Sequence, residues 1–112
     1  MVKKKAYAPD RGDIVWLNFT PQSGHEQAGK RPALVLSPRS YNEKVGLAIF
    51  CPVTSQVKGY PFEVRLSGKI KGVVLSDQIR SLDWTTRNAE FIEKASSKVI
   101  SEVFLNVQTL LQ

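Results

Sequence analysis

The chain has 112 residues, 42% of them hydrophobic, and a formal net charge of +6. This length has room for one hydrophobic core, so we expect a single domain over 1–112. A single cysteine and a single histidine exclude an internal disulfide and a zinc site built from Cys and His, and we expect neither metal nor cofactor. No apolar run reaches the ~18 residues of a membrane span and no signal peptide opens the chain, so a cytoplasmic protein is expected. The net charge of +6 favours a polyanionic partner.

The N-terminal segment and the central part of the chain differ in pattern. Residues 1–10 contain three lysines and end in Pro-Asp, which predicts a flexible basic arm. Short runs rich in Val, Ile, Leu and Phe follow, separated by Gly, Pro, Asn and Ser, at residues 13–19, 33–37, 47–53, 62–66, 72–77, 79–84 and 89–94. This spacing favours a mainly β, largely antiparallel barrel or sandwich.

The spacing of the apolar residues changes in the C-terminal segment, residues 96–112. Val99, Val103, Val107 and Leu110 recur on one stripe, with Ile100, Phe104 and Leu111 beside it, and Ser96 or Ser97 is suited to cap the first turn. The segment therefore predicts an amphipathic C-terminal helix that closes the core or a dimer. Cys51, within an apolar run, is expected to be a buried structural thiol.

The stretch "GHEQAGKRPALVLSP" sets a polar, glycine-bracketed loop against an apolar strand. Pro32 fixes the chain as it enters the strand, so Arg31 should project from a rigid point beside a loop with three polar side chains and a second cation. These neighbours are His25, Glu26, Gln27 and Lys30. The alternative is that Arg31 is a strand-end cation paired with a carboxylate.

Two further strand ends carry polar residues. "PVTSQVKGYPFEV" supplies Thr54, Ser55, Gln56 and Lys58, and "LSDQIRS" supplies Asp77, Gln78 and Arg80. If these strand ends converge on Arg31, the combined surface suits a phosphodiester with bases on either side. Each group also has a local interpretation: the hydroxyls form turns, Asp77 holds Arg80, and the two tryptophans belong to the core or an interface. Tyr41 and Tyr60 are candidates for base stacking.

The sequence resembles the MazF/PemK toxins of bacterial toxin–antitoxin modules. "RGDIVWLNFTPQSGHEQAGKRPALVLSP" is similar to that family's G-D-[IL]-[VI]-W strand, E-Q-x-G-x-R-P loop and apolar strand ending in Ser-Pro. "YN", "CPVTSQVKGYPFEV", "LSG" and "GVVLSDQIRSLDW" follow in the family's order, so the resemblance covers nearly the whole chain.

The resemblance implies an SH3-like barrel of about five to seven strands with a C-terminal helix. It also implies a homodimeric, sequence-specific, metal-independent endoribonuclease that cleaves single-stranded mRNA and arrests translation. The expected partner is an acidic antitoxin of the MazE/PemI type, through which the complex can bind operator DNA. By the same resemblance Arg31, Thr54 and Glu26 are the catalytic residues. The expected substrate-binding residues are His25, Gln27, Lys30, Ser55, Gln56, Lys58, Asp77, Gln78 and Arg80.

Metal-free RNA cleavage uses the 2′-hydroxyl as nucleophile and leaves a 2′,3′-cyclic phosphate and a 5′-hydroxyl. The guanidinium of Arg31 can hydrogen-bond two oxygens of the phosphorane, and Thr54 can donate a third bond. Arginine stays charged in proteins, so Glu26 and His25 are both candidate bases. Two alternatives remain: a gyrase-inhibiting toxin of the CcdB type, although this chain lacks its C-terminal Trp-Gly-Ile, and a non-catalytic RNA-binding module.

Overall fold

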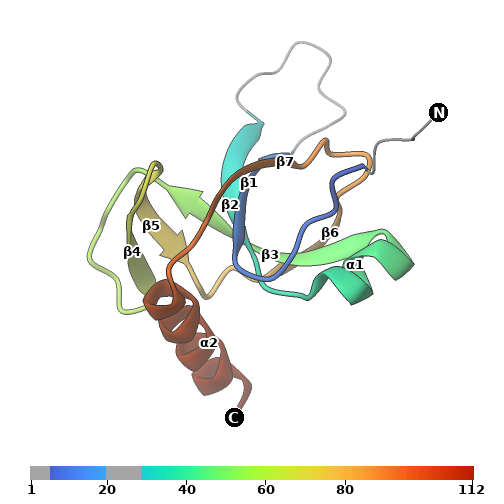
Figure 1. The fold of residues 1–112 in the computed structure, drawn as a ribbon. Coiled ribbons are helices and arrows are strands. Elements are labelled where there is room, and N and C mark those ends of the chain that lie inside the picture. The colour runs from blue at the N-terminus through green and yellow to red at the C-terminus, as the bar shows by residue number, and fades with distance from the viewer. Residues whose placement is uncertain (1–5, 20–28) are drawn as a thin grey trace, which may run out of the picture.

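The computed structural model describes residues 6–19 and 29–112. Within these ranges the chain forms a curled antiparallel sheet in the strand order β4-β5-β3-β2-β1-β7, with β6 paired to β3 (Figure 1). The elements are β1 Asp13–Asn18, β2 Lys30–Val35, α1 Arg39–Val45, β3 Leu47–Thr54, β4 Glu63–Ser67, β5 Lys71–Leu75, β6 Arg80–Asp83, β7 Glu90–Lys94 and α2 Ser97–Leu111. The prediction of a mainly β fold with a C-terminal helix is confirmed.

The central strands β1, β2 and β3 are buried on both faces. Ile14, Leu34 and Cys51 belong to one apolar cluster, which α2 covers with Val99 and Val103. The alternate residues of the same strands, together with Leu82 of β6, belong to a second cluster, made of Val15, Leu17, Ala33, Val35, Ala48, Phe50 and Leu82. Burial on both faces explains why these strands read as nearly continuous apolar runs in the sequence. The expected burial of Cys51 is confirmed.

Helix α2 begins where the sequence predicts it to begin. The Ser96 hydroxyl accepts a hydrogen bond from the backbone N–H of Val99 at 3.2 Å, which satisfies a donor of the first turn. Val99 and Val103 are buried, but Leu110 and Leu111 at the end of the predicted stripe are exposed, because the helix extends past the sheet there. None of the helices in residues 6–19 and 29–112 is long and apolar enough to cross a membrane.

Helix α1 has no counterpart among the predicted elements. Of its seven residues only Asn42 is buried, so it has no apolar stripe that would predict a helix. The Asn42 amide accepts a bond from the Ser37 hydroxyl at 2.6 Å and donates to the carbonyl oxygens of Pro9 and Ser37 at 2.8 and 3.0 Å. Buried hydrogen bonds therefore hold α1 against the body of the protein.

The expectation of a flexible arm over 1–10 is wrong for its last residues. Ala8 and Pro9 are buried, and the Tyr7 hydroxyl donates to Asp13 at 2.6 Å. Residues 1–5, which contain the three lysines, lie outside the described residues. The apolar side chains at the end of the arm gain more from packing than from solvation, so this part of the segment joins the core.

Candidate functional site

Arg31 and Thr54 come from neighbouring strands of the sheet. Strand β2 begins at Lys30, earlier than the run 33–37 predicts, so Arg31 lies within the strand and pairs with Leu17 of β1. On its other edge β2 pairs with β3, where Ala33 is opposite Pro52. Continued along both strands, the same register sets Arg31 opposite Thr54, and side chains opposite each other in an antiparallel pair share a face. The topology therefore brings the predicted arginine and hydroxyl to one place.

The backbone pairing of β2 and β3 ends before it reaches these two residues. The paired positions of β2 and β3 stop at Ala33 and Pro52, and the next residue of β2 toward the site, Pro32, has no backbone N–H to donate. On its far edge β3 continues to pair with β5, through Val53 and Thr54. Thr54 is thus paired with β5 on one side and lies beyond the paired residues of β2 and β3 on the other, where Arg31 lies.

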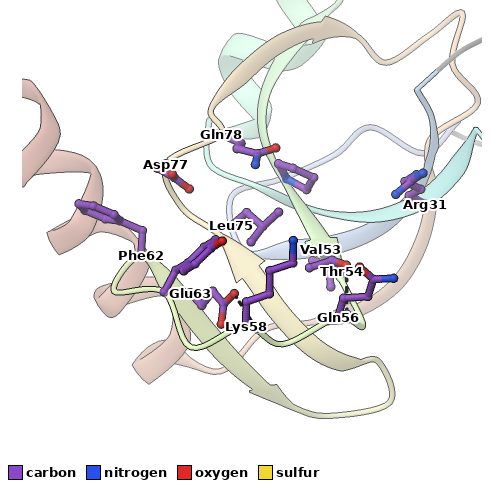
Figure 2. A pocket seen from close by; sticks show the side chains of 12 residues that line it. Arg31, Val53, Thr54, Gln56, Lys58, Phe62, Glu63, Leu75, Asp77 and Gln78 are labelled. Carbon is purple, nitrogen blue, oxygen red and sulfur yellow. Dashed lines mark hydrogen bonds between the residues drawn. The ribbon is translucent and has the colours of Figure 1, made fainter.

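A pocket of about 270 Å³ is lined by both residues (Figure 2). Arg31 enters it from β2, Thr54 from the end of β3, and Asp77 and Gln78 from the turn between β5 and β6. The loop that follows β3 closes the other side. Its residues at the pocket are Gln56, Lys58, Tyr60 and Phe62, and the wall is completed by Pro52, Val53, Glu63 and Leu75.

Hydrogen bonds to the backbone shape the loop between β3 and β4. The Thr54 hydroxyl accepts a bond from the backbone N–H of Gln56 at 3.1 Å, which forms a turn at the strand end. The Glu63 carboxylate accepts bonds from the backbone N–H groups of Lys58 and Gly59 at 3.1 and 2.9 Å. The Lys58 ammonium lies 6.0 Å from the centre of the Tyr60 ring. The loop therefore presents its cation and its ring to the pocket from an anchored backbone.

Two charged groups of the pocket, Arg31 and Asp77, are available to a ligand. Within residues 6–19 and 29–112, neither the guanidinium of Arg31 nor the carboxylate of Asp77 makes a hydrogen bond or an ion pair. The alternative interpretation, in which Asp77 holds Arg80, is therefore wrong: the Arg80 guanidinium stacks over the Phe19 ring, 5.5 Å from its centre. Unpaired charges of both signs at a pocket can bind a polar ligand without first breaking internal bonds.

The only cysteine is not part of this chemistry. Burial raises the pKa of the Cys51 thiol to about 12, so the thiolate needed for nucleophilic attack is not formed at neutral pH. Among the described residues no group of three or more His, Cys, Asp or Glu side chains is placed to hold a metal ion. The reactive groups at the pocket are thus cations, a hydroxyl, amides and carboxylates.

Not all of the predicted site residues reach the pocket. Ser55 does not line it and belongs instead to a second pocket, which also includes Arg31 and Thr54. Lys30 and Arg80 line neither pocket: the Lys30 ammonium forms an ion pair with Glu90 at 3.2 Å, and Arg80 stacks on Phe19. The predicted loop residues His25, Glu26 and Gln27 lie outside the described residues.

Sequence reasoning missed two kinds of residue. The sequence gives no signal for Glu63, because a polar residue at the start of a strand is common, and only the fold shows that its carboxylate anchors the loop. Lys69, Lys71 and Gly72 belong to a hairpin whose approach to Thr54 no local pattern reveals. A signal was present for Gly72 alone, since a glycine within a β-type run indicates close approach of another backbone.

The fold and the pocket together define a small, basic, mainly β protein with an arginine, near the start of a central strand, that forms no ion pair within the described residues. The model of the PemK-like, MazF-like toxins of type II toxin–antitoxin systems matches residues 10–111, and the chain belongs to this family. It is 55% identical over 84 residues to the endoribonuclease toxin MazF of Escherichia coli strain K12, which covers 74% of this chain and 76% of that protein.

Solved structures agree with this assignment. The crystal structure of MazF (Form I) from Deinococcus radiodurans matches with a TM-score of 0.86 and 56% identity, over 95% of this chain and 98% of that one. A MazE–MazF complex (Form II) from the same organism matches with a TM-score of 0.85 and 51% identity, over 95% and 97% of the two chains. The resemblance seen in the sequence is therefore confirmed.

Proposed function

We propose that the protein is the toxin of a type II toxin–antitoxin module and a sequence-specific endoribonuclease that cleaves single-stranded mRNA and so arrests translation. The observation that carries this proposal is that Arg31 and Thr54 line one pocket just beyond the point where β2 and β3 stop pairing, with the guanidinium unpaired among the described residues. Relatives named endoribonuclease toxins, at 55% and 38% identity, support the activity.

In the proposed reaction the 2′-oxygen of the nucleotide 5′ of the scissile bond attacks the adjacent phosphorus. The bond from phosphorus to the 5′-oxygen breaks, which leaves a 2′,3′-cyclic phosphate on one fragment and a 5′-hydroxyl on the other. The guanidinium of Arg31 donates hydrogen bonds to two oxygens of the phosphorane, whose negative charge grows in the transition state. The Thr54 hydroxyl, which accepts from Gln56, has its own proton left to donate to the same centre.

The proposed reaction moves two protons, one from the 2′-hydroxyl and one to the leaving 5′-oxygen. Arginine is already protonated at neutral pH and cannot take up the 2′ proton, so Arg31 serves as the charge-stabilising group and as a candidate acid toward the strongly basic leaving 5′-oxygen. Glu26 and His25 are the candidate bases. Both lie outside the described residues, and the choice between them is left to mutagenesis of each.

The proposed readout of bases uses the rest of the first pocket. Asp77 and Gln78 offer a carboxylate and an amide, which can hydrogen-bond the edge of an unpaired base. Tyr60, 61% exposed, offers a ring on which a base can stack, and Lys58 beside it can contact a phosphate. Single-stranded RNA is the substrate that exposes both base edges and base faces.

The proposed partners follow from the family. MazE–MazF complexes have been solved for relatives at 51% identity, and we expect this chain to bind an acidic antitoxin of that kind and to act as a homodimer. A net charge of +6 favours an acidic polypeptide as inhibitor, and the complex can bind operator DNA through the antitoxin. Because bacterial mRNA is translated in the cytoplasm, the proposed place of action is the cytoplasm.

The decisive experiment replaces one ribose of a cleavable oligonucleotide, the ribose 5′ of the mapped cut, by 2′-deoxyribose. This removes the proposed nucleophile and keeps the bases and the phosphate charge, so binding should persist and cleavage should stop. The all-RNA oligonucleotide should give a 5′ fragment with a cyclic phosphate and a 3′ fragment with a 5′-hydroxyl. Efficient cutting at the deoxy position would mean that water or a protein side chain attacks.

The same assay separates the alternatives. A gyrase-inhibiting toxin and a non-catalytic RNA-binding module would both leave the all-RNA oligonucleotide whole. A supercoiling assay with gyrase then distinguishes these two.

A further inference from the structure

A second pocket, of about 570 Å³, adjoins the first. The two pockets share Arg31, Val53, Thr54 and Gln56, so the arginine and the hydroxyl lie on the boundary between them. The remaining lining of the second pocket is Pro32 and Ser55 together with three residues of the hairpin between β4 and β5: Lys69, Ile70 and Lys71. A bound polymer that crosses Arg31 and Thr54 would therefore meet the first pocket on one side and the second pocket on the other.

The turn of this hairpin is fastened to a distant strand. The carboxylate of Glu93 in β7 accepts hydrogen bonds from the backbone N–H groups of Lys69 and Ile70, both at 3.0 Å. Gly68 permits this approach, because a Cβ on it would lie 2.5 Å from a Glu93 oxygen. The anchor uses main-chain groups, so it fixes the position of the turn and leaves the lysine side chains free.

The two lysines are exposed and form no close ion pair in the part of the chain that the structure describes. Lys69 and Lys71 are exposed, and within residues 6–19 and 29–112 neither ammonium lies within 4.0 Å of a carboxylate oxygen. Both oxygens of Glu93 accept bonds from the backbone of the turn, and its single negative charge offsets only part of the positive charge of the two lysines. The rim of the second pocket thus presents positive charge beside Arg31.

We propose that the second pocket is an RNA-backbone subsite, in which Lys69 and Lys71 bind phosphates on one side of the scissile phosphate. This inference rests on the proposed ribonuclease function. Both pockets share the Gln56 amide. The first adds Asp77 and Gln78, whose carboxylate and amide can read a base, whereas the second adds Lys69, Lys71 and the Ser55 hydroxyl, which suit phosphate and ribose. Binding in the second pocket is therefore independent of base identity and sensitive to salt.

The observations favour RNA over an acidic protein as the occupant. The second pocket contains the two groups that the proposed reaction needs at the scissile phosphate, so the neighbouring phosphate of the same strand must pass close to it. An acidic polypeptide has no scissile phosphate that must lie at Arg31, so nothing requires it to pass close to this pocket. Its binding to this face is one outcome of the experiment below.

The test compares wild-type protein with the double variant Lys69→Ala/Lys71→Ala. The ligands are oligonucleotides that carry the mapped cleavage site with a 2′-deoxyribose 5′ of the cut, either minimal or extended by a few nucleotides on the 5′ or the 3′ side. Lys44→Ala serves as control, because Lys44 is an exposed lysine of α1 at the opposite end of β3 from Thr54. Affinity is measured by fluorescence anisotropy over a series of salt concentrations.

We expect the double variant to bind the minimal oligonucleotide like wild type and to lose roughly tenfold in affinity for one of the two extended ones, as the loss of two exposed charge contacts implies. Its salt slope for that ligand should fall by about 1.4, since each phosphate contact to a single strand contributes about 0.7. Changing the bases of the extension should leave the loss unaltered. Lys44→Ala should match wild type on every ligand.

Glu93→Ala provides an independent arm, because it releases the turn and keeps both lysines. It should reproduce part of the loss for the same extended oligonucleotide, and hydrogen exchange at the amides of Lys69 and Ile70 should accelerate. Wild-type affinity of the double variant for both extended oligonucleotides would overturn the subsite, and so would an equal loss on all ligands. Polyglutamate serves as a model acidic polypeptide in the same assay. If the double variant binds RNA like wild type but no longer binds polyglutamate, the face belongs to an acidic protein and not to RNA. If wild type cleaves no RNA, the proposed function itself fails.

Discussion

Gly72 leaves no room for a side chain against the backbone of Thr54. A Cβ on Gly72 would overlap the carbonyl oxygen of Thr54 and lie 3.1 Å from the Cα of Ser55. Gly72 also has a φ of 120°, a conformation that residues with a side chain rarely adopt. A glycine in β5 thereby sets the position of the hydroxyl at the end of β3, and we regard Gly72 as a positioning residue.

Gly72→Ala should therefore displace the strand end that carries Thr54. We expect a loss of about 2 kcal/mol or more in the free energy of unfolding, from the strained φ and the backbone overlap together. Cleavage by the folded fraction should fall through kcat, because the displaced group acts on the transition state. Denaturant unfolding and steady-state kinetics measure the two effects.

Gly46→Ala is the matched control. Gly46 has a φ of 77° at the C-terminal end of α1, and an added Cβ would meet nothing within 4 Å. This variant should lose about 1 kcal/mol of stability from the left-handed backbone alone and keep its kcat. Equal kcat values for the two variants would show that Gly72 does not position the site.

Arg31→Ala should lower kcat by about 10²–10³-fold, the usual cost of removing a donor that stabilises transition-state charge. Affinity for the 2′-deoxy oligonucleotide should change much less than kcat. Arg31→Lys should recover little, because an ammonium cannot form the two parallel hydrogen bonds of a guanidinium. Arg65→Ala, an exposed arginine of β4 that lines neither pocket, should behave like wild type. Near wild-type cutting by Arg31→Lys would contradict the bidentate role.

Thr54→Val keeps the shape of the side chain and removes the hydroxyl. We expect kcat to fall by about tenfold to a hundredfold, because one donor to the phosphorane is lost along with the bond to the Gln56 N–H. Thr54→Ser restores the hydroxyl and should restore most of the activity. If Thr54→Val and Thr54→Ser cleave equally well, the hydroxyl has no part in the reaction.

Chelation should leave cleavage intact. Among residues 6–19 and 29–112 no cluster of carboxylate, imidazole and thiol groups is placed as metal ligands, and the proposed nucleophile belongs to the RNA. Cleavage of a long RNA in excess EDTA should therefore proceed at the rate seen without chelator. Loss of activity in EDTA that returns with Mg²⁺ would require a metal in the mechanism, and the RNA should be checked separately for Mg²⁺-dependent folding.

The anchor of the β4–β5 turn should make stability depend on pH. Hydrogen bonds from the backbone N–H groups of Lys69 and Ile70 lower the pKa of Glu93 below its ordinary value of 4.5. A carboxyl group with a lowered pKa stabilises the folded state fully above its ordinary pKa, and this contribution is lost as the pH falls through the lowered value. Glu93→Gln should therefore unfold more readily than wild type at pH 7.

The difference between Glu93→Gln and wild type should shrink progressively below pH 4.5, where the wild-type carboxylate becomes protonated. Glu102→Gln, on the exposed side of α2, is the control and should follow wild type at every pH. Denaturant midpoints between pH 3 and pH 7 measure both. A stability gap that is constant over this range would mean that the charge of Glu93 does not matter.

The sequence by itself determined which segments become strands and where the last helix begins. Val, Ile and Leu runs between glycines and prolines marked all seven strands, and Ser96 marked the start of α2, because burial and capping act over a few neighbouring residues. The sequence pattern does not predict helix α1, because the single buried side chain of this helix, Asn42, is polar. Its stability comes from bonds to Pro9 and Ser37 that no local pattern encodes.

The sequence also identified Arg31 and Thr54 as candidate catalytic residues, but only the tertiary structure determined how these two residues lie relative to each other. Their alignment depends on the register between β2 and β3, and the gap between them depends on the point where that pairing stops. The same holds for Lys30, which binds Glu90 of β7, and for the β4–β5 turn, which Glu93 fastens beside Thr54. Residues far apart in the chain meet only after the sheet has curled, and the contacts that select each partner do not exist in the separate segments.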